Sequence, residues 1–240
     1  MDSRLLARRL ERFNERFGRG RDAALASLLR GLEAAGLGDG WELGVSSFPE
    51  RSEIAVRYRG AAARPRPWRQ ALAALFGRTP ARACSLSDSP WPRLEIRWDL
   101  KAGRWTRGLL YAGAEPSSRR LARFLLAVPG RPAAALLLEP VAWGALDFGD
   151  SAARKVLREL AAFAPVRDSV MHWDLAGGQK RPSGCWSLRL QEPLPWPHFL
   201  GLDAARAFQE RSAGMAAAAG AGTVCELLFE PDRLWAYGAG

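Results

Sequence analysis

Five arginines occupy polar positions in segments that alternate between apolar and polar residues, and such a group of guanidinium side chains could bind an anion. They are Arg57, Arg59, Arg97, Arg107 and Arg189. Successive side chains of a β-strand point to opposite faces, so these arginines would share one face, away from neighbours such as Ile54 and Ile96. Guanidinium forks match phosphate oxygens, whereas uncompensated positive charges side by side repel one another. The pattern favours a bound anion such as a diphosphate, which would offset this charge.

Aromatic residues are a second notable feature, because the chain has 10 tryptophans among its 240 residues. Four aromatic side chains are expected to face the arginines: Tyr111, Trp143, Trp235 and Tyr237. There the faces of their rings could shield a positively charged carbon centre. Ordinary packing is the favoured interpretation for Trp98, Trp173 and Trp186.

Carboxylates in the same kind of segment could accept a proton. Glu42 lies in the alternating run Trp41–Ser46, and further candidates are Asp99, Asp147 and Asp174. Several acids near Glu42 would suit a cationic acceptor such as a guanidine, but they could equally pair with the arginines. A zinc site is not expected, because the 2 histidines, His172 and His198, and the 3 cysteines are widely spaced.

The net charge of +10 comes almost entirely from arginine. It could reflect the composition of a GC-rich genome, or it could attract an anionic partner. No block of five or more like charges occurs, which speaks against nucleic acid as the partner. No apolar run reaches the roughly 18 residues of a membrane-spanning helix, and the start of the chain lacks the apolar stretch of a signal peptide. We therefore expect a cytoplasmic protein that contacts neither membrane nor nucleic acid.

Five hairpins, each preceded by helical sequence, account for most of the chain. The hairpins are expected at 41–46 with 53–59, 94–99 with 104–112, 134–139 with 143–148, 170–175 with 184–190, and 223–229 with 233–237. The helical segments are expected at 3–35 with a break near Gly18, and at 67–77, 118–128, 151–163 and 203–218.

We predict that the five αββ units form one domain over residues 1–240, a ten-stranded antiparallel β-barrel surrounded by helices. Closure would remove the exposed edges of so large a sheet, and the polar face would then line the interior, here called the lumen. A short similarity between Ile96–Leu100 and Met171–Leu175 supports a repeated unit. The alternative is an open sheet with helices on one face and water on the other.

This pattern resembles the ABBA prenyltransferases, and among them the cyanobactin enzymes that modify ribosomally made peptides. Gly40–Gly44 with Ile54–Arg57 is similar to the family's first hairpin, Arg107–Tyr111 to a strand of its second, and Asp232–Tyr237 to its aromatic-rich last strand. The resemblance implies that Glu42 faces the acceptor as the catalytic base. It also implies a diphosphate site at Arg57, Arg107, Arg189 and Tyr237, and shielding of the allyl cation by Tyr111, Trp143 and Trp235.

The implied reaction transfers a dimethylallyl or geranyl group from its diphosphate, with Mg²⁺ accompanying the diphosphate, to a linear or macrocyclic peptide. The resemblance implies no metal-ligating side chain, and the acceptor would lie beside Arg97, Asp99, His172 and Asp174. The open alternatives are a prenyltransferase acting on small aromatic molecules and a barrel that binds an anionic or lipidic ligand without catalysis.

Overall fold

The protein is described from a computed structural model, which places the following parts of the chain: residues 1–17, 39–46, 53–59, 94–99, 102–114, 121–128, 131, 134–142, 166–195, 223–231 and 233–238. One helix and ten strands lie in these parts. They are α1 (Ser3–Phe17), β1 (Trp41–Ser46), β2 (Glu53–Tyr58), β3 (Leu94–Asp99), β4 (Arg104–Ala114), β5 (Ala122–Ala127), β6 (Ala134–Val141), β7 (Val166–Ala176), β8 (Gln179–Pro195), β9 (Thr223–Glu230) and β10 (Arg233–Gly238).

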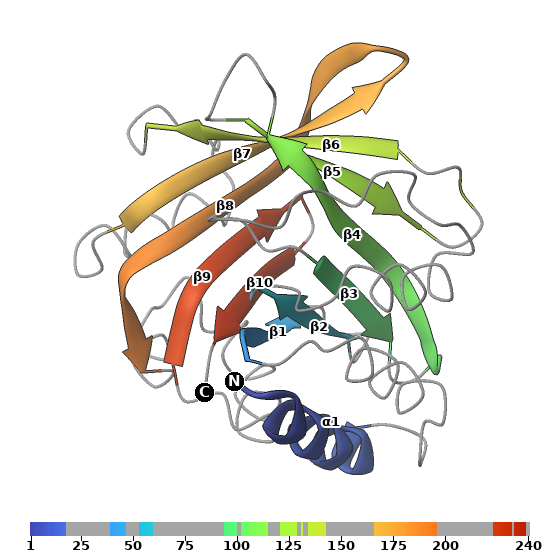
Figure 1. Cartoon of the computed structure of the whole chain (residues 1–240), viewed down its shortest axis with the longest axis vertical. Helices are drawn as coiled ribbons and strands as arrows, with labels where there is room; N and C mark the ends of the chain where they lie inside the picture. The colour runs from blue at the N-terminus through green and yellow to red at the C-terminus, as the bar shows by residue number, and fades with distance from the viewer. Residues whose placement is uncertain are drawn as a thin grey trace.

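The ten strands form one closed antiparallel barrel in which every strand pairs with its neighbours in sequence (Figure 1). Strands β1 and β10 close the circle, with Leu43 opposite Gly238 and Ser46 opposite Trp235. The predicted ten-stranded barrel is therefore confirmed, and the open-sheet alternative is wrong. Closure brings strands far apart in the sequence side by side, so that residues of β2 and β3 can reach residues of β9 and β10.

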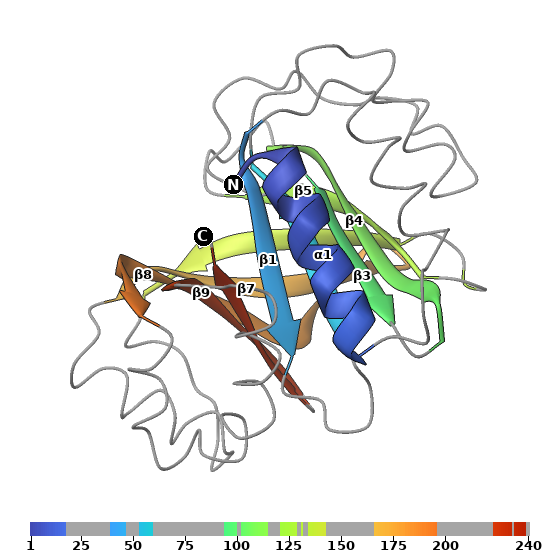
Figure 2. The same ribbon diagram turned by 90° about the horizontal axis from the view of Figure 1, so that it is seen from below.

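Helix α1 lies on the outside of the barrel, beside β1 (Figure 2). Asp2 caps it, because the amide of Leu5 donates to Asp2 Oδ1 at 2.6 Å. Leu6 and Leu10, four residues apart on one face of the helix, are buried, as is Trp41 on β1. The first helix is thus confirmed. The other predicted helical segments, apart from the one at 118–128, lie outside the described residues, so neither a surrounding layer of helices nor five αββ repeats is established.

The helix predicted at 118–128 is wrong where the structure describes it, because Ala122–Ala127 is strand β5. Its alanines and leucines favour a helix locally, but β4 on one side and β6 on the other pair with its backbone. Pairing with two neighbours outweighs a weak local preference. The third hairpin is consequently β5 with β6 rather than 134–139 with 143–148, and residues 143–148 lie outside the described part of the chain.

The other four hairpins are confirmed, and the fourth is longer than predicted. It joins β7 and β8 at Gly177 and Gly178, whose φ angles of 61° and 79° lie in the region that favours glycine. Both strands extend beyond the predicted limits, and two register shifts between them bend the sheet at this side of the barrel.

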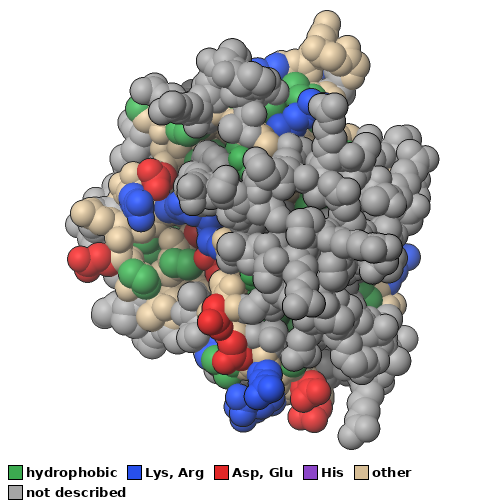
Figure 3. Space-filling view, viewed as in Figure 1, with side chains coloured by type: hydrophobic (Ala, Val, Ile, Leu, Met, Phe, Trp, Pro, Cys, Tyr) green, Lys and Arg blue, Asp and Glu red, His purple; other side chains and the backbone are tan. Residues whose placement is uncertain are grey.

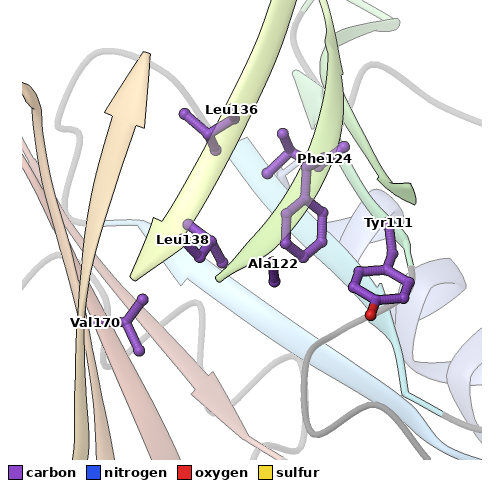
Figure 4. Close-up of a cluster of buried hydrophobic side chains, with 7 residues drawn as sticks. Tyr111, Ala122, Phe124, Leu136, Leu138 and Val170 are labelled. Carbon is purple, nitrogen blue, oxygen red and sulfur yellow. The ribbon is translucent and has the colours of Figure 1, made fainter. Parts of the chain in front are cut away.

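The lumen has an apolar side formed by strands β4 to β7. Its buried residues are Leu109, Tyr111, Ala122, Phe124, Leu136, Leu138 and Val170. Figure 4 shows these side chains pointing from neighbouring strands into one space, and the rings of Tyr111 and Phe124 meet edge to face with centroids 5.4 Å apart. We call this group the apolar cluster.

Charged side chains of both signs lie on the outside of the molecule. On the face drawn in Figure 3, Lys and Arg side chains of the described residues lie close to Asp and Glu side chains. In the part of the chain that the structure describes, no helix is long and apolar enough to cross a membrane.

Candidate functional site

The side of the lumen opposite the apolar cluster holds a continuous chain of alternating acidic and basic side chains, which we call the ionic ladder. In order along the chain of contacts, its members are Glu42, Arg59, Glu226, Arg57, Glu95, Arg97, Glu230 and Arg107. They come from strands β1 to β4 and β9 and from Arg59 just after β2. The predicted alternation of strands β2 and β3 is confirmed, because their arginines face inward.

Two buried carboxylates hold the middle of the ladder. Arg57 donates from Nε to Glu95 at 2.5 Å and from Nη1 to Glu226 at 2.6 Å. Arg97 Nε donates to the other oxygen of Glu95 at 2.8 Å. Arg59 donates to the other oxygen of Glu226. Glu95 and Glu226 therefore each bind arginines through both carboxylate oxygens.

Glu230 is the last carboxylate of the ladder, and it also uses both of its oxygens. Its Oε1 accepts from Arg97 Nη1 and Arg107 Nη1, each at 2.7 Å, and its Oε2 accepts from the indole of Trp235 at 3.1 Å. Glu42 differs, because Oε1 accepts from Arg59 Nε at 2.5 Å while Oε2 is buried without a hydrogen-bond partner among the described residues. A buried carboxylate oxygen that no arginine occupies can accept a proton, which is what a general base requires.

Two aromatic rings lie against the arginines of the ladder. The guanidinium carbon of Arg57 is 3.2 Å from the ring centroid of Tyr237, and that of Arg97 is 4.2 Å from the ring centroid of Trp235. The Tyr237 hydroxyl also donates to Glu95 at 3.2 Å. These contacts fix the arginines by cation–π attraction and place Trp235 and Tyr237 within the ladder.

The electrostatic balance keeps the ladder charged at neutral pH. Burial alone would raise the pKa of Glu226, but the neighbouring Arg57 and Arg59 outweigh this effect and lower it to about 2. The pKa of Glu95 is likewise held well below its usual range by Arg57 and Arg97, against the effect of burial. The arginines are thus compensated by protein carboxylates, contrary to the expectation that a bound anion must offset their charge.

Arg189 on β8 is joined to this system by longer contacts. Its Nε lies 3.6 Å from Glu226 and its Nη1 lies 3.9 Å from Asp168, compared with 2.5–2.8 Å for the ion pairs of Arg57 and Arg97. Burial, and to a lesser degree the nearby Arg59, lower the pKa of Arg189, whereas Glu226, Glu42 and Asp168 act to raise it. An anion beside Arg189 would favour the charged form of its guanidinium.

A cavity lies between the ladder and the apolar cluster. The cavity is narrow and partly open to solvent. Its lining includes the charged residues Arg57, Glu95, Arg189 and Glu226, the polar residues His172 and Ser187, and the apolar residues Leu109, Phe124, Leu136, Leu138 and Val170. One wall is therefore ionic and the other is hydrocarbon.

His172 stands where the two walls meet. Its Nε2 and the hydroxyl of Ser187 share a hydrogen bond of 2.9 Å, whereas Nδ1 is buried without a hydrogen-bond partner among the described residues. Burial, together with Arg107 and Arg57, lowers the pKa of His172 to about 3. The imidazole is consequently neutral, and Nδ1 offers the cavity one further polar atom.

Most of the residues predicted to form a site are brought together in the lumen. Glu42, Arg57, Arg97, Arg107, Trp235 and Tyr237 belong to the ladder or pack against it, Arg189 and His172 line the cavity, and Tyr111 belongs to the apolar cluster. Asp99 is buried, and its carboxylate accepts from the amide of Ala102 at 3.0 Å in the turn after β3. Asp174 on β7 is partly buried and lies opposite Leu136. Trp143 and Asp147 lie outside the described residues.

Three residues of the ladder were not among those predicted for the site: Glu95, Glu226 and Glu230. The alternation of their strands was a usable signal, because Glu95 precedes Arg97 by two positions and Glu226 precedes Glu230 by four. Residues separated by an even number of positions on a regular strand share a face.

A protein-held metal ion does not fit the described residues. They contain no group of three or more His, Cys, Asp or Glu side chains placed to bind a metal ion. Moreover, Glu95, Glu226 and Glu230 each use both carboxylate oxygens to accept hydrogen bonds from the protein.

Comparison with known proteins yields no relative. No protein-family model matches the chain, and neither the curated proteins nor the solved structures provide a match. The function is therefore argued from the lumen alone.

Proposed function

We propose that this barrel transfers a prenyl group from an allylic diphosphate to a nucleophilic side chain or terminus of a peptide. The observation that carries the proposal is the two-sided cavity, with Arg57 and Arg189 on one wall and residues such as Phe124 and Leu138 on the other. A prenyl diphosphate has the same division into an anionic head and a hydrocarbon tail. Ligand cavities commonly combine an apolar lining with a few charged groups that orient the ligand.

The diphosphate would bind at the ionic wall. Arg57 and Arg189 line this wall, and Arg107 and Tyr237 support it through Glu230 and Glu95. Guanidinium groups stabilise the negative charge that develops as the carbon–oxygen bond of the allylic diphosphate breaks and the diphosphate leaves with the bonding electrons. Placing these arginines on rigid strands lowers the reorganisation required at that moment.

The prenyl tail would lie against the apolar cluster, where Tyr111 and Phe124 present aromatic rings. These residues exclude water from the allylic cation, and aromatic rings attract a positive charge. Trp235 would act less directly, because Arg97 covers one face of its ring. The acceptor's lone pair then forms the new bond to the allylic carbon.

The acceptor's proton would pass to Glu42 Oε2, the buried oxygen that no arginine of the described chain occupies. Glu42 is connected to the cavity wall through Arg59 and Glu226. Since the described residues offer no ligand cluster for a metal, we expect any Mg²⁺ to enter bound to the diphosphate, whose charge it would help to neutralise. The cytoplasmic location, the length of the prenyl group and the peptide acceptor stay predictions.

The test is to incubate the protein with dimethylallyl or geranyl diphosphate and peptides that differ only in one Arg, Tyr, Trp or His. Mass spectrometry and pyrophosphate release then report transfer. Glu42→Gln should abolish turnover and preserve affinity for the prenyl diphosphate. The matched control is Glu139→Gln, which alters a half-buried carboxylate paired with Lys180 at 2.5 Å and outside the cavity lining, and should leave transfer unchanged.

The second candidate is a barrel that binds an amphipathic anion without catalysis. The saturation of three ladder carboxylates by hydrogen bonds favours it, because such a ladder is stable without any reaction. Binding of prenyl diphosphate without pyrophosphate release from any peptide would support this candidate and contradict the enzyme.

A further inference from the structure

Glu226 stands in an unusual position, because three arginines converge on its carboxylate. Arg57 Nη1 donates to Oε1 at 2.6 Å, Arg59 Nη2 donates to Oε2, and Arg189 Nε lies 3.6 Å from Oε2. Glu226 is buried and at the same time lines the cavity between the ladder and the apolar cluster. A ligand in this cavity would therefore meet both the carboxylate and two of the arginines that bind it.

Three convergent guanidinium groups form a site that suits a phosphate better than a carboxylate. A carboxylate offers one negative charge and two oxygens, whereas a terminal phosphate offers more charge and three oxygens to the same donors.

Each arginine of the cluster also has a second carboxylate that would keep it in place if Glu226 left. Arg57 is held by Glu95 at 2.5 Å, and Arg59 is held by Glu42 at 2.5 Å. Arg189 lies 3.9 Å from Asp168. The cluster is therefore preorganised by contacts that do not involve Glu226.

We propose that Glu226 occupies the lumen's anion site as an internal substitute, and that the phosphate end of a ligand must displace its carboxylate from Arg57, Arg59 and Arg189. The identification of the ligand as a diphosphate rests on the proposed function. The displacement makes Glu226 a determinant of affinity: the carboxylate neutralises the arginines while the cavity is empty, and it repels an anion that enters.

The experiment compares binding of inorganic pyrophosphate to the wild type and to Glu226→Gln by isothermal titration calorimetry. Glutamine keeps the shape and one acceptor oxygen and removes the negative charge. The variant should bind pyrophosphate at least about tenfold more tightly, because one charge–charge repulsion inside the cavity is gone. Pyrophosphate should also raise the melting temperature of the variant more than that of the wild type, since the ligand restores the missing charge.

The matched control is Glu139→Gln, which removes one carboxylate on β6 that pairs with Lys180, belongs to no part of the ladder and does not line the cavity. Its affinity for pyrophosphate should stay within about threefold of the wild type. Equal tightening in both variants would overturn the proposal, because it would indicate a general effect of the protein's net charge. Unchanged or weaker binding by Glu226→Gln would overturn it as well.

Arg189→Met provides a second measurement if Glu226→Gln fails to fold. Removal of this arginine from the cluster should weaken pyrophosphate binding at least about tenfold, and unchanged binding would overturn the proposal. The two proposals fail separately. If the wild type transfers a prenyl group but the Glu226→Gln substitution does not change pyrophosphate binding, only the proposed displacement is refuted. If the substitution tightens pyrophosphate binding but no prenyl group is transferred, only the proposed enzymatic function is refuted.

Discussion

Gly44 on β1 is a position at which a single methyl group should disturb the lumen. A Cβ atom there would lie 2.4 Å from Cε1 and 2.6 Å from Cδ1 of Tyr237, and 3.1 Å from the Cβ of Ala55. Carbon atoms in contact are normally about 3.5–4.0 Å apart, so the ring would have to move by about 1 Å. The tyrosine ring, and not a ligand, fills the space that the absence of a side chain leaves.

Tyr237 has little freedom to make this move. Its ring lies against Arg57, with 3.2 Å between the guanidinium carbon and the ring centroid, and its hydroxyl donates to Glu95 at 3.2 Å. Overpacking in a core costs about 1–3 kcal/mol, and a weakened hydrogen bond to a charged group costs about 1.5–3 kcal/mol. The lower chain entropy of alanine in the unfolded state offsets about 0.5–1 kcal/mol.

We therefore expect Gly44→Ala to lower the free energy of unfolding by about 1.5–5.5 kcal/mol. Urea titration followed by tryptophan fluorescence measures it, with Gly44→Ala/Tyr237→Leu as the control in which the clash is relieved. The double variant should lose less than the sum of the two single variants. A Gly44→Ala variant within about 0.5 kcal/mol of the wild type would refute the reasoning, because the ring would then be free to shift.

Three further outcomes are expected. Burial holds the pKa of His172 near 3, so only the unfolded chain gains this proton below about pH 6.5. The free energy of unfolding should therefore fall by about 1.6 kcal/mol in total from pH 6.5 to 5, and by less in His172→Gln. Arg97→Met should lower the free energy of unfolding, measured by urea titration, by about 3–5 kcal/mol, because it removes the partner of two buried carboxylates. A loss below about 1 kcal/mol would contradict an intact ladder. Phe124→Ala should lower the free energy of unfolding by about 3–5 kcal/mol, because Phe124 is buried in the apolar cluster. Arg123 is exposed on the same strand, so Arg123→Ala should stay within about 0.5 kcal/mol of the wild type.

The sequence predicts a hairpin well when the residues that indicate it, a glycine turn and the alternating segments beside it, are close together in the chain. Gly177 and Gly178 mark a tight turn between two alternating runs, and the turn lies where it was expected. The failure at Ala122–Ala127 has the opposite cause. Its residues are good helix formers, and only pairing with β4 and β6 makes them a strand. Such pairing cannot be read from six residues.

The inward positions of the site follow from alternation, but the contacts among them do not. Arg57 and Glu226 are 169 positions apart, and Arg97 and Glu230 are 133 positions apart. Only closure of the barrel between β1 and β10 brings these residues together. The arginines therefore suggested a missing anion, whereas two of the carboxylates that balance them, Glu226 and Glu230, lie near the other end of the sequence.

Barrel closure has a consequence for the order in which the chain is synthesised. Strands β9 and β10 leave the ribosome after the other eight strands, and they carry Glu226, Glu230, Trp235 and Tyr237. Until this last hairpin arrives, Arg57 and Arg97 each keep Glu95 but lack one of their two carboxylates and the aromatic ring that covers them in the finished protein. A nascent chain of eight strands would thus carry uncompensated positive charge, which attracts polyanions such as the ribosomal RNA beside it.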